Sequence, residues 1–200
     1  MKDALLMLVK IIFAVLLIPT CYALSTSFLQ QLPKLAEFQH LFVWGVVVYV
    51  LLQLFFYSPQ GVFQAGQKIF GEIFKSVPLL AAVVPLFVPI IPTILLVGCY
   101  VTISFFDYQP AKSYLIFFGG FTFAMHLILS AHAEFEEDSN GLKPHYLFLF
   151  SLTYIFNILI IALLLSLNFS DFSFTDMWIS AYDTAKDIYL TVYDQLFLVK

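Results

Sequence analysis

The 200-residue chain has no arginine and few charges of either sign. Its nine basic residues are all lysines, and 13 acidic residues leave a net charge of −4. Proteins that bind nucleic acid present clustered cations to the phosphates, and no basic cluster occurs here. We therefore expect no nucleic-acid partner.

Charged residues make up 11% of the chain, whereas hydrophobic residues make up 62% and the mean hydropathy is +0.94. In a typical soluble domain about a quarter of residues are charged. A soluble fold of this length would leave roughly a quarter to a third of its surface exposed, and most of that surface would be apolar. We therefore expect a lipid bilayer to surround most of the protein.

Cysteine is also scarce, and the sequence contains no familiar catalytic motif. Cys21 and Cys99 lie within apolar runs, where a thiol behaves as a small hydrophobic group, so no disulfide framework is expected. Phosphate-binding loops, CxxC pairs, dinucleotide fingerprints and nucleophile motifs are not found. The sequence favours a protein that is not an enzyme, and it assigns no cofactor.

Five uncharged stretches are each suited to form a membrane-spanning helix, for which about 20 apolar residues are needed. They predict an all-α, polytopic transmembrane bundle of about five spans. We expect the first helix to be retained rather than cleaved as a signal peptide, because Lys10 interrupts its apolar core. The predicted spans are residues 11–29, 41–57, 92–106, 113–133 and 146–167.

The third span is preceded by a proline-rich stretch, which makes the apolar run of residues 77–106 too long for one straight crossing. Pro85, Pro89 and Pro92 would share one face of a continuous helix, and each removes a backbone donor. Two interpretations remain open. The stretch is either a bent structural helix or a hinge that lines a groove or pathway.

Two further segments have the pattern of amphipathic helices. Residues 62–77 predict a helix that lies in the membrane interface or packs as a connector on the protein. Residues 171–200 predict a C-terminal helix appended to a membrane domain of residues 1–170. Its polar stripe is either a solvated face or a docking surface for a protein partner, and it is built around four aspartates, Asp176, Asp183, Asp187 and Asp194.

His126 is an ionisable residue in the middle of the fourth predicted span, where such groups are costly and often functional. It shares a helical face with Gly119, Thr122 and Ser130, and we expect this face to be buried. The imidazole is a candidate proton relay, metal or haem ligand, or catalytic base. The alternative is a neutral imidazole that bonds to Asn157 or Thr153 on the fifth span and so joins two helices.

His132, Glu136 and His145 form a second, weaker candidate group, placed around the turn between the fourth and fifth spans. His132 and Glu136 are four residues apart on one helical face, and His145 returns after the turn. The three side chains are candidate metal ligands. The same pattern is typical of a hydrated connector between helices.

Lysines in short loops predict the orientation, because cytoplasmic loops are enriched in them. With five spans, Lys2, Lys10, Lys68, Lys75 and Lys143 fall on one side, which predicts a cytoplasmic N-terminus in a bacterial inner membrane and a C-terminal helix on the opposite side. The functional hypothesis is an integral subunit of a larger envelope or transport complex, acting as an anchor, an assembly factor or part of a pathway. The alternatives are a stand-alone transporter or channel with a proton-linked histidine and an intramembrane metal- or haem-dependent enzyme.

Overall fold

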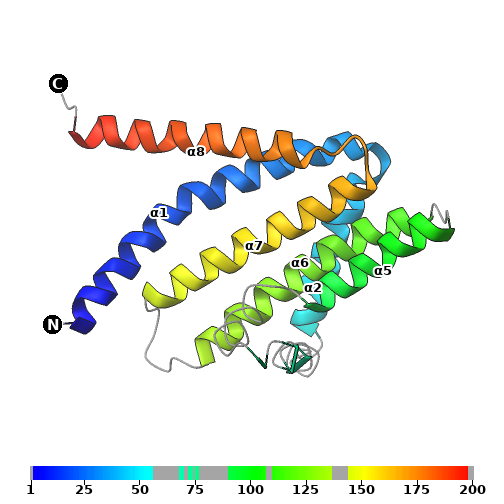
Figure 1. Cartoon of the computed structure of the whole chain (residues 1–200), viewed down its shortest axis with the longest axis horizontal. Coiled ribbons are helices and arrows are strands. Elements are labelled where there is room, and N and C mark those ends of the chain that lie inside the picture. Colours follow the sequence, from blue (N-terminus) through cyan, green and yellow to red (C-terminus); the bar gives the residue numbers. More distant parts are fainter. Residues whose placement is uncertain are drawn as a thin grey trace.

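The structure, a computed structural model, describes residues 2–55, 68–69, 72–73, 75–76, 90–106, 110–136 and 144–197. These residues form helices joined by short turns, and no strand occurs among them (Figure 1). The predicted all-α class is confirmed. The elements are α1 (Lys2–Gln31), the 3-10 helix η1 (Leu32–Phe38), α2 (Gln39–Phe55), α5 (Ile90–Phe106), α6 (Pro110–Glu136), α7 (Pro144–Asn168) and α8 (Phe174–Phe197).

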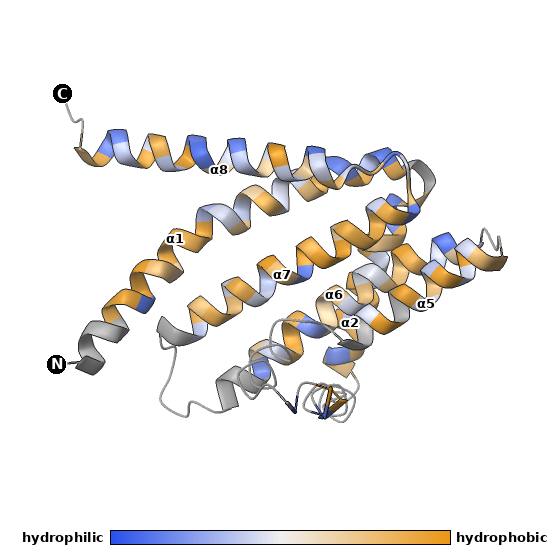
Figure 2. Ribbon diagram, viewed as in Figure 1, coloured by the Kyte–Doolittle hydropathy of each residue, from blue (hydrophilic) through white to orange (hydrophobic). Residues whose placement is uncertain are grey.

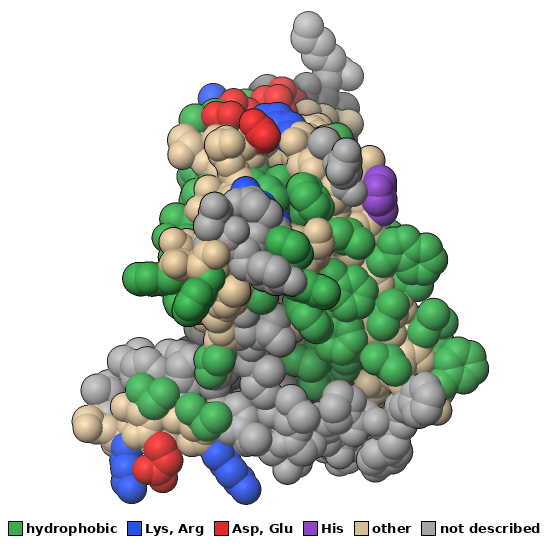
Figure 3. All heavy atoms as spheres, turned by 90° about the vertical axis from the view of Figure 1, so that its right-hand side faces the viewer, with side chains coloured by type: hydrophobic (Ala, Val, Ile, Leu, Met, Phe, Trp, Pro, Cys, Tyr) green, Lys and Arg blue, Asp and Glu red, His purple; other side chains and the backbone are tan. Residues whose placement is uncertain are grey.

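Among the described residues, three helical segments are long and apolar enough to cross a membrane: Leu8–Leu35, Pro110–His132 and Tyr146–Asn168. Shorter apolar helices cover Gln39–Phe55 and Val97–Phe106. Hydrophobic residues dominate these helices, whereas α8 alternates between hydrophilic and hydrophobic positions (Figure 2). Figure 3 shows one face on which charged side chains gather in the upper and lower parts, with apolar side chains between them.

The proline-rich stretch is only partly described. Helix α5 begins at Ile90, so Pro92 lies in its first turn, where a proline is tolerated because the first amide groups of a helix have no partner within it. Pro85 and Pro89 lie outside the described residues. So does most of the predicted amphipathic helix of residues 62–77, and neither prediction is tested.

Helix α6 lies at the centre of the bundle, with 56% of its candidate span buried against 17% for α1. It packs against α2, α5 and α7, while α1 packs on α7 and α8 on α1. Figure 1 shows that α7 runs antiparallel to α6, and that α8 starts near the end of α7 and returns along α1.

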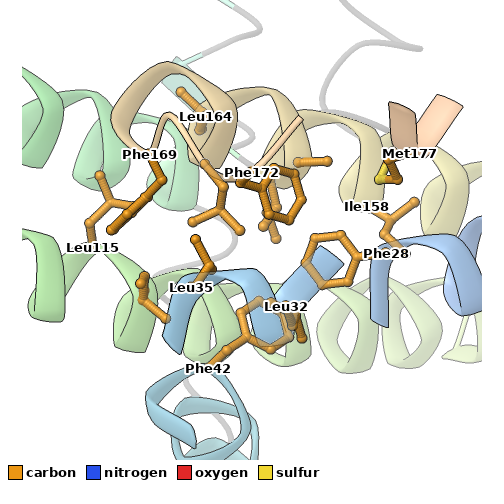
Figure 4. Close-up of a cluster of buried hydrophobic side chains, with 14 of the residues drawn as sticks. Phe28, Leu32, Leu35, Phe42, Leu115, Ile158, Leu164, Phe169, Phe172 and Met177 are labelled. Carbon is orange, nitrogen blue, oxygen red and sulfur yellow. The ribbon is translucent and has the colours of Figure 1, made fainter. Parts of the chain in front are cut away.

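A cluster of buried side chains joins α1, η1, α2, α6, α7 and the start of α8 at one end of the bundle (Figure 4). The Phe28 ring packs 5.3 Å from that of Phe42 and 5.8 Å from that of Phe172, measured between centroids. Aromatic pairs at such distances contribute about 0.5–1.5 kcal/mol beyond the area they bury. This cluster holds the ends of α1 and α7 next to the beginning of α8.

Helices α2 and α6 approach each other backbone to backbone at two glycines. A Cβ atom built on Gly45 would lie 2.0 Å from the carbonyl oxygen of Phe117, and one on Gly120 would lie 2.0 Å from that of Phe42. The adjacent Gly119 has ordinary space, since its Cβ would meet the Phe42 ring at 3.9 Å. Small residues at such contacts allow close helix packing in lipid.

We expect Gly120→Ala to destabilise the protein by about 1–3 kcal/mol or more, because the methyl group cannot fit without moving α2. Gly119→Ala is the matched control. It should leave stability within about 1 kcal/mol, since alanine also favours the helix. Denaturation by SDS in mixed micelles, followed by circular dichroism, measures both. Equal losses for the two variants would contradict the described packing.

Candidate functional site

A buried polar layer lies between α6 and α7. Asn157 is fully buried and His126 is 3% exposed, and their Nδ2 and Nδ1 atoms are 2.8 Å apart. The predicted burial of the His126 face is found, since Gly119, Thr122 and Ser130 are buried as well. The structure thus brings together the two side chains that the sequence suggests as partners.

The hydrogen bonds assign a tautomer to this histidine. The Nδ2 atom of Asn157 also lies 2.8 Å from the carbonyl oxygen of Thr153, which can only accept. That atom is therefore the amide nitrogen, and it donates its second proton to Nδ1 of His126. An Nδ1 that accepts carries no proton, so the imidazole is neutral with its proton on Nε2.

Two hydroxyl groups belong to the next layer of the same interface. Ser130 is one turn beyond His126 on α6, and Thr153 is one turn before Asn157 on the antiparallel α7. Within the described part of the chain, Ser130 Oγ, Thr153 Oγ1 and Asn157 Oδ1 are buried without a hydrogen-bond partner. Buried polar atoms of this kind commonly hold an internal water molecule.

The second candidate group is not assembled by the described side chains. His132 is exposed near the end of α6. The side chains of Glu136 and His145 lie outside the described residues, although their backbones belong to the end of α6 and the start of α7. Among the described side chains, no group of three potential metal ligands is found.

The start of α8 is fixed by a local cap and by contacts with α1. The backbone amide of Asp176 donates to Ser173 Oγ at 3.1 Å, which makes Ser173 the N-cap residue. Phe172 and Met177, which flank this cap, are both buried in the core cluster. The backbone amide of Ser173 lies 3.5 Å from Oε1 of Gln31, so the turn into α8 is tied to the end of α1.

Helix α8 then follows α1 through side-chain hydrogen bonds. Ser180 pairs with Ser27 at 3.1 Å, and about two and a half turns further along α8 the Tyr189 hydroxyl lies 3.0 Å from Thr20 Oγ1. The Tyr189 hydroxyl also donates to the Leu16 carbonyl oxygen. Leu16 is about 12 Å along the helix from Leu8 and about 22 Å from Gln31. These contacts therefore lie beside the candidate span of α1. The location of α8 on the outer side of the membrane stays a prediction.

The four stripe residues Asp176, Asp183, Asp187 and Asp194 are all exposed and form no ion pair within the described residues. At about 100° per residue they share one side of the helix. A second side, with Met177, Ala181 and Ile188, packs on α1. A third side carries Trp178, Tyr182, Tyr189 and Tyr193. The apolar residues that the sequence places opposite the aspartates form a stripe of Trp178, Ala181, Ala185, Ile188, Val192 and Leu196. This apolar stripe is divided in the structure, because Ala181 is buried while Trp178, Val192 and Leu196 are exposed.

The sequence analysis does not predict a role for two residues of α8, Tyr189 and Lys186. Tyr189 anchors α8 to α1, but a tyrosine on a mixed helix gives no signal for a partner 169 residues away. Lys186 is the only basic residue of α8. Its position on the helix wheel, away from the acidic stripe, was the available signal.

We expect His126→Leu and Asn157→Leu to be coupled in a double-mutant cycle by roughly 0.6–1.7 kcal/mol, between the average and the maximum measured for hydrogen bonds between membrane helices. His132→Leu, on the exposed end of the same helix, should not couple to Asn157→Leu. Nitrogen NMR of histidine-labelled protein, with His126→Gln to assign the signal, should find Nε2 protonated. A protonated Nδ1 would contradict the assigned tautomer.

The described residues thus present two polar arrangements: a closed layer that joins α6 to α7, and an open acidic stripe on α8. The first can hold helices together or accommodate a water molecule. The second can bind a cationic surface.

Comparisons with protein-family models, with curated proteins and with solved structures find no match to this chain.

Proposed function

We propose that this protein is an integral membrane subunit of a larger envelope or transport complex, in which it acts as an anchor or assembly component without catalysis. The acidic stripe of α8 is its docking surface. The partner is a membrane protein whose docking segment carries lysine or arginine residues.

The position of the stripe is the observation that supports this proposal. Tyr189 bonds to Thr20 and Leu16, at levels inside the candidate span of α1. Aspartates on the same helix would then meet lipid if nothing covered them. A carboxylate in hydrocarbon costs at least about 2.5 kcal/mol, so polar groups at this depth face protein or water and pair with an opposite charge.

Five crossings are part of the proposal. Helices α1, α2, α5, α6 and α7 are all apolar, and the two shorter ones, α2 and α5, would complete the bundle around α6. We place the N-terminus in the cytoplasm of a bacterium, with α8 starting on the opposite side of the inner membrane. Cysteine labelling tests this: Lys34→Cys and Asp171→Cys should react from outside, and Lys75→Cys only after the membrane is permeabilised.

A second candidate is a stand-alone transporter or channel with His126 as a proton-linked group. The buried oxygens of Ser130, Thr153 and Asn157, which lack a partner within the described residues, favour it, because a polar path needs such groups. Flux across liposomes reconstituted with the purified chain, lost in His126→Ala, distinguishes this function from that of a passive subunit.

We expect the double variant Asp183→Asn, Asp187→Asn to release the protein from its complex, with affinity for the partner lowered at least tenfold, because charge pairs that hold an interface are lost. Native gel electrophoresis of membranes dissolved in mild detergent measures the size of the complex for each variant.

Asp171→Asn is the matched control, since Asp171 is exposed in the turn before α8 and lies outside the stripe. It should leave the complex intact. A wild-type chain that migrates alone at every salt concentration, or a double variant that stays bound, would refute the docking role.

A further inference from the structure

A groove of about 610 Å³ lies between α8, α1 and α7, on the aromatic side of α8 and away from its acidic stripe. Thr20 and Leu24 of α1 and Ile155 of α7 line its inner wall. Its volume falls in the range of about 300–1,000 Å³ that is usual for ligand sites. The groove therefore has the size of a binding site for one small or single-chain molecule.

Four of the eight α8 side chains that line this groove are aromatic, and all four carry a hydrogen-bond donor. Trp178, Tyr182 and Tyr193 are each at least half exposed and form no hydrogen bond within the described residues. The hydroxyl groups of Tyr189 and Thr20, by contrast, already form hydrogen bonds. The Tyr189 hydroxyl proton goes to the Leu16 carbonyl, so the Thr20 hydroxyl is the donor in the bond between the two side chains.

Basic and acidic residues lie on different sides of α8. Lys186, its only basic residue, lines the groove, whereas none of its four aspartates does. Lys186 forms no ion pair within the described residues, although Asp183 precedes it by three positions and Asp187 follows it. A cation beside a candidate membrane span is stabilised by an anionic partner.

We propose that this groove binds a long-chain fatty acid, with its carboxylate on Lys186 and its aliphatic chain along the aromatic rings. The apolar walls fit an acyl chain, and the free phenol, indole and ammonium donors fit an acceptor headgroup. A groove of this volume suits one chain better than the two chains of a phospholipid. The inner wall of the groove belongs to α1 and α7, which both contain candidate membrane spans, and a bilayer around these spans would supply the fatty acid.

Trp178 provides a direct test, because it lines the groove and only Trp44 must be replaced to leave it as the single reporter. In Trp44→Phe protein in detergent micelles, dibromostearate should quench Trp178 fluorescence at concentrations on the order of tenfold lower than its uncharged methyl ester, as expected for a charge-assisted hydrogen bond. Lys186→Gln should abolish this preference. Lys34→Gln, a matched change of an exposed lysine on η1, should preserve it.

Ala185→Phe, which fills the groove from α8, should weaken quenching by both probes. Lys186→Gln removes an exposed charge without removing packing, so it decides the proposal even where the larger side chain perturbs the fold. Equal quenching by acid and ester in the starting protein, or a preference that survives Lys186→Gln, would overturn the proposal. The double variant Asp183→Asn, Asp187→Asn should keep the preference, so loss of partner docking and loss of fatty-acid binding are separate outcomes.

Discussion

The structure depends on one constraint: every polar group among these apolar helices needs a partner other than lipid. Hydrocarbon offers no hydrogen bonds. Moving an isolated polar group from water to cyclohexane, which cannot form hydrogen bonds, costs about 4–8 kcal/mol. The chain satisfies much of this demand internally. The Asn157 side chain forms hydrogen bonds with both Thr153 and His126, and the Tyr189 hydroxyl forms hydrogen bonds with both Thr20 and Leu16.

The same constraint acts differently on the polar layer between α6 and α7 and on the acidic stripe of α8. Between α6 and α7 the polar groups are enclosed, and their effect is to set the register of two helices. On α8 the aspartates remain open, and their effect depends on what covers them. Charge on a helix that packs along a candidate span needs an opposite charge, protein or water beside it, and this need supports the proposal of a subunit in a complex.

Close packing provides the rigid frame on which α8 is placed. Helices α2 and α6 touch at Gly45 and Gly120, and the phenylalanine cluster around Phe28 and Phe172 fixes the turn into α8. Because the start of α8 is capped and tied to Gln31, its direction is set before it meets Thr20. The acidic stripe and the aromatic groove therefore lie on different sides of α8.

The amino-acid sequence alone determined the class of the protein, because apolar runs of about 20 residues and scarce charge have few other physical solutions. It also predicted that the His126 face is buried, since helical periodicity places it inward, and it offered Asn157 or Thr153 as a partner in one of the alternatives left open for His126. It singled out Gly119, whereas the tertiary structure decided that Gly45 and Gly120 make the backbone contact. The packing of α8 along α1 and the division of its apolar stripe were also decided only by the tertiary structure, because a pattern along one helix carries no information about which neighbour covers each side.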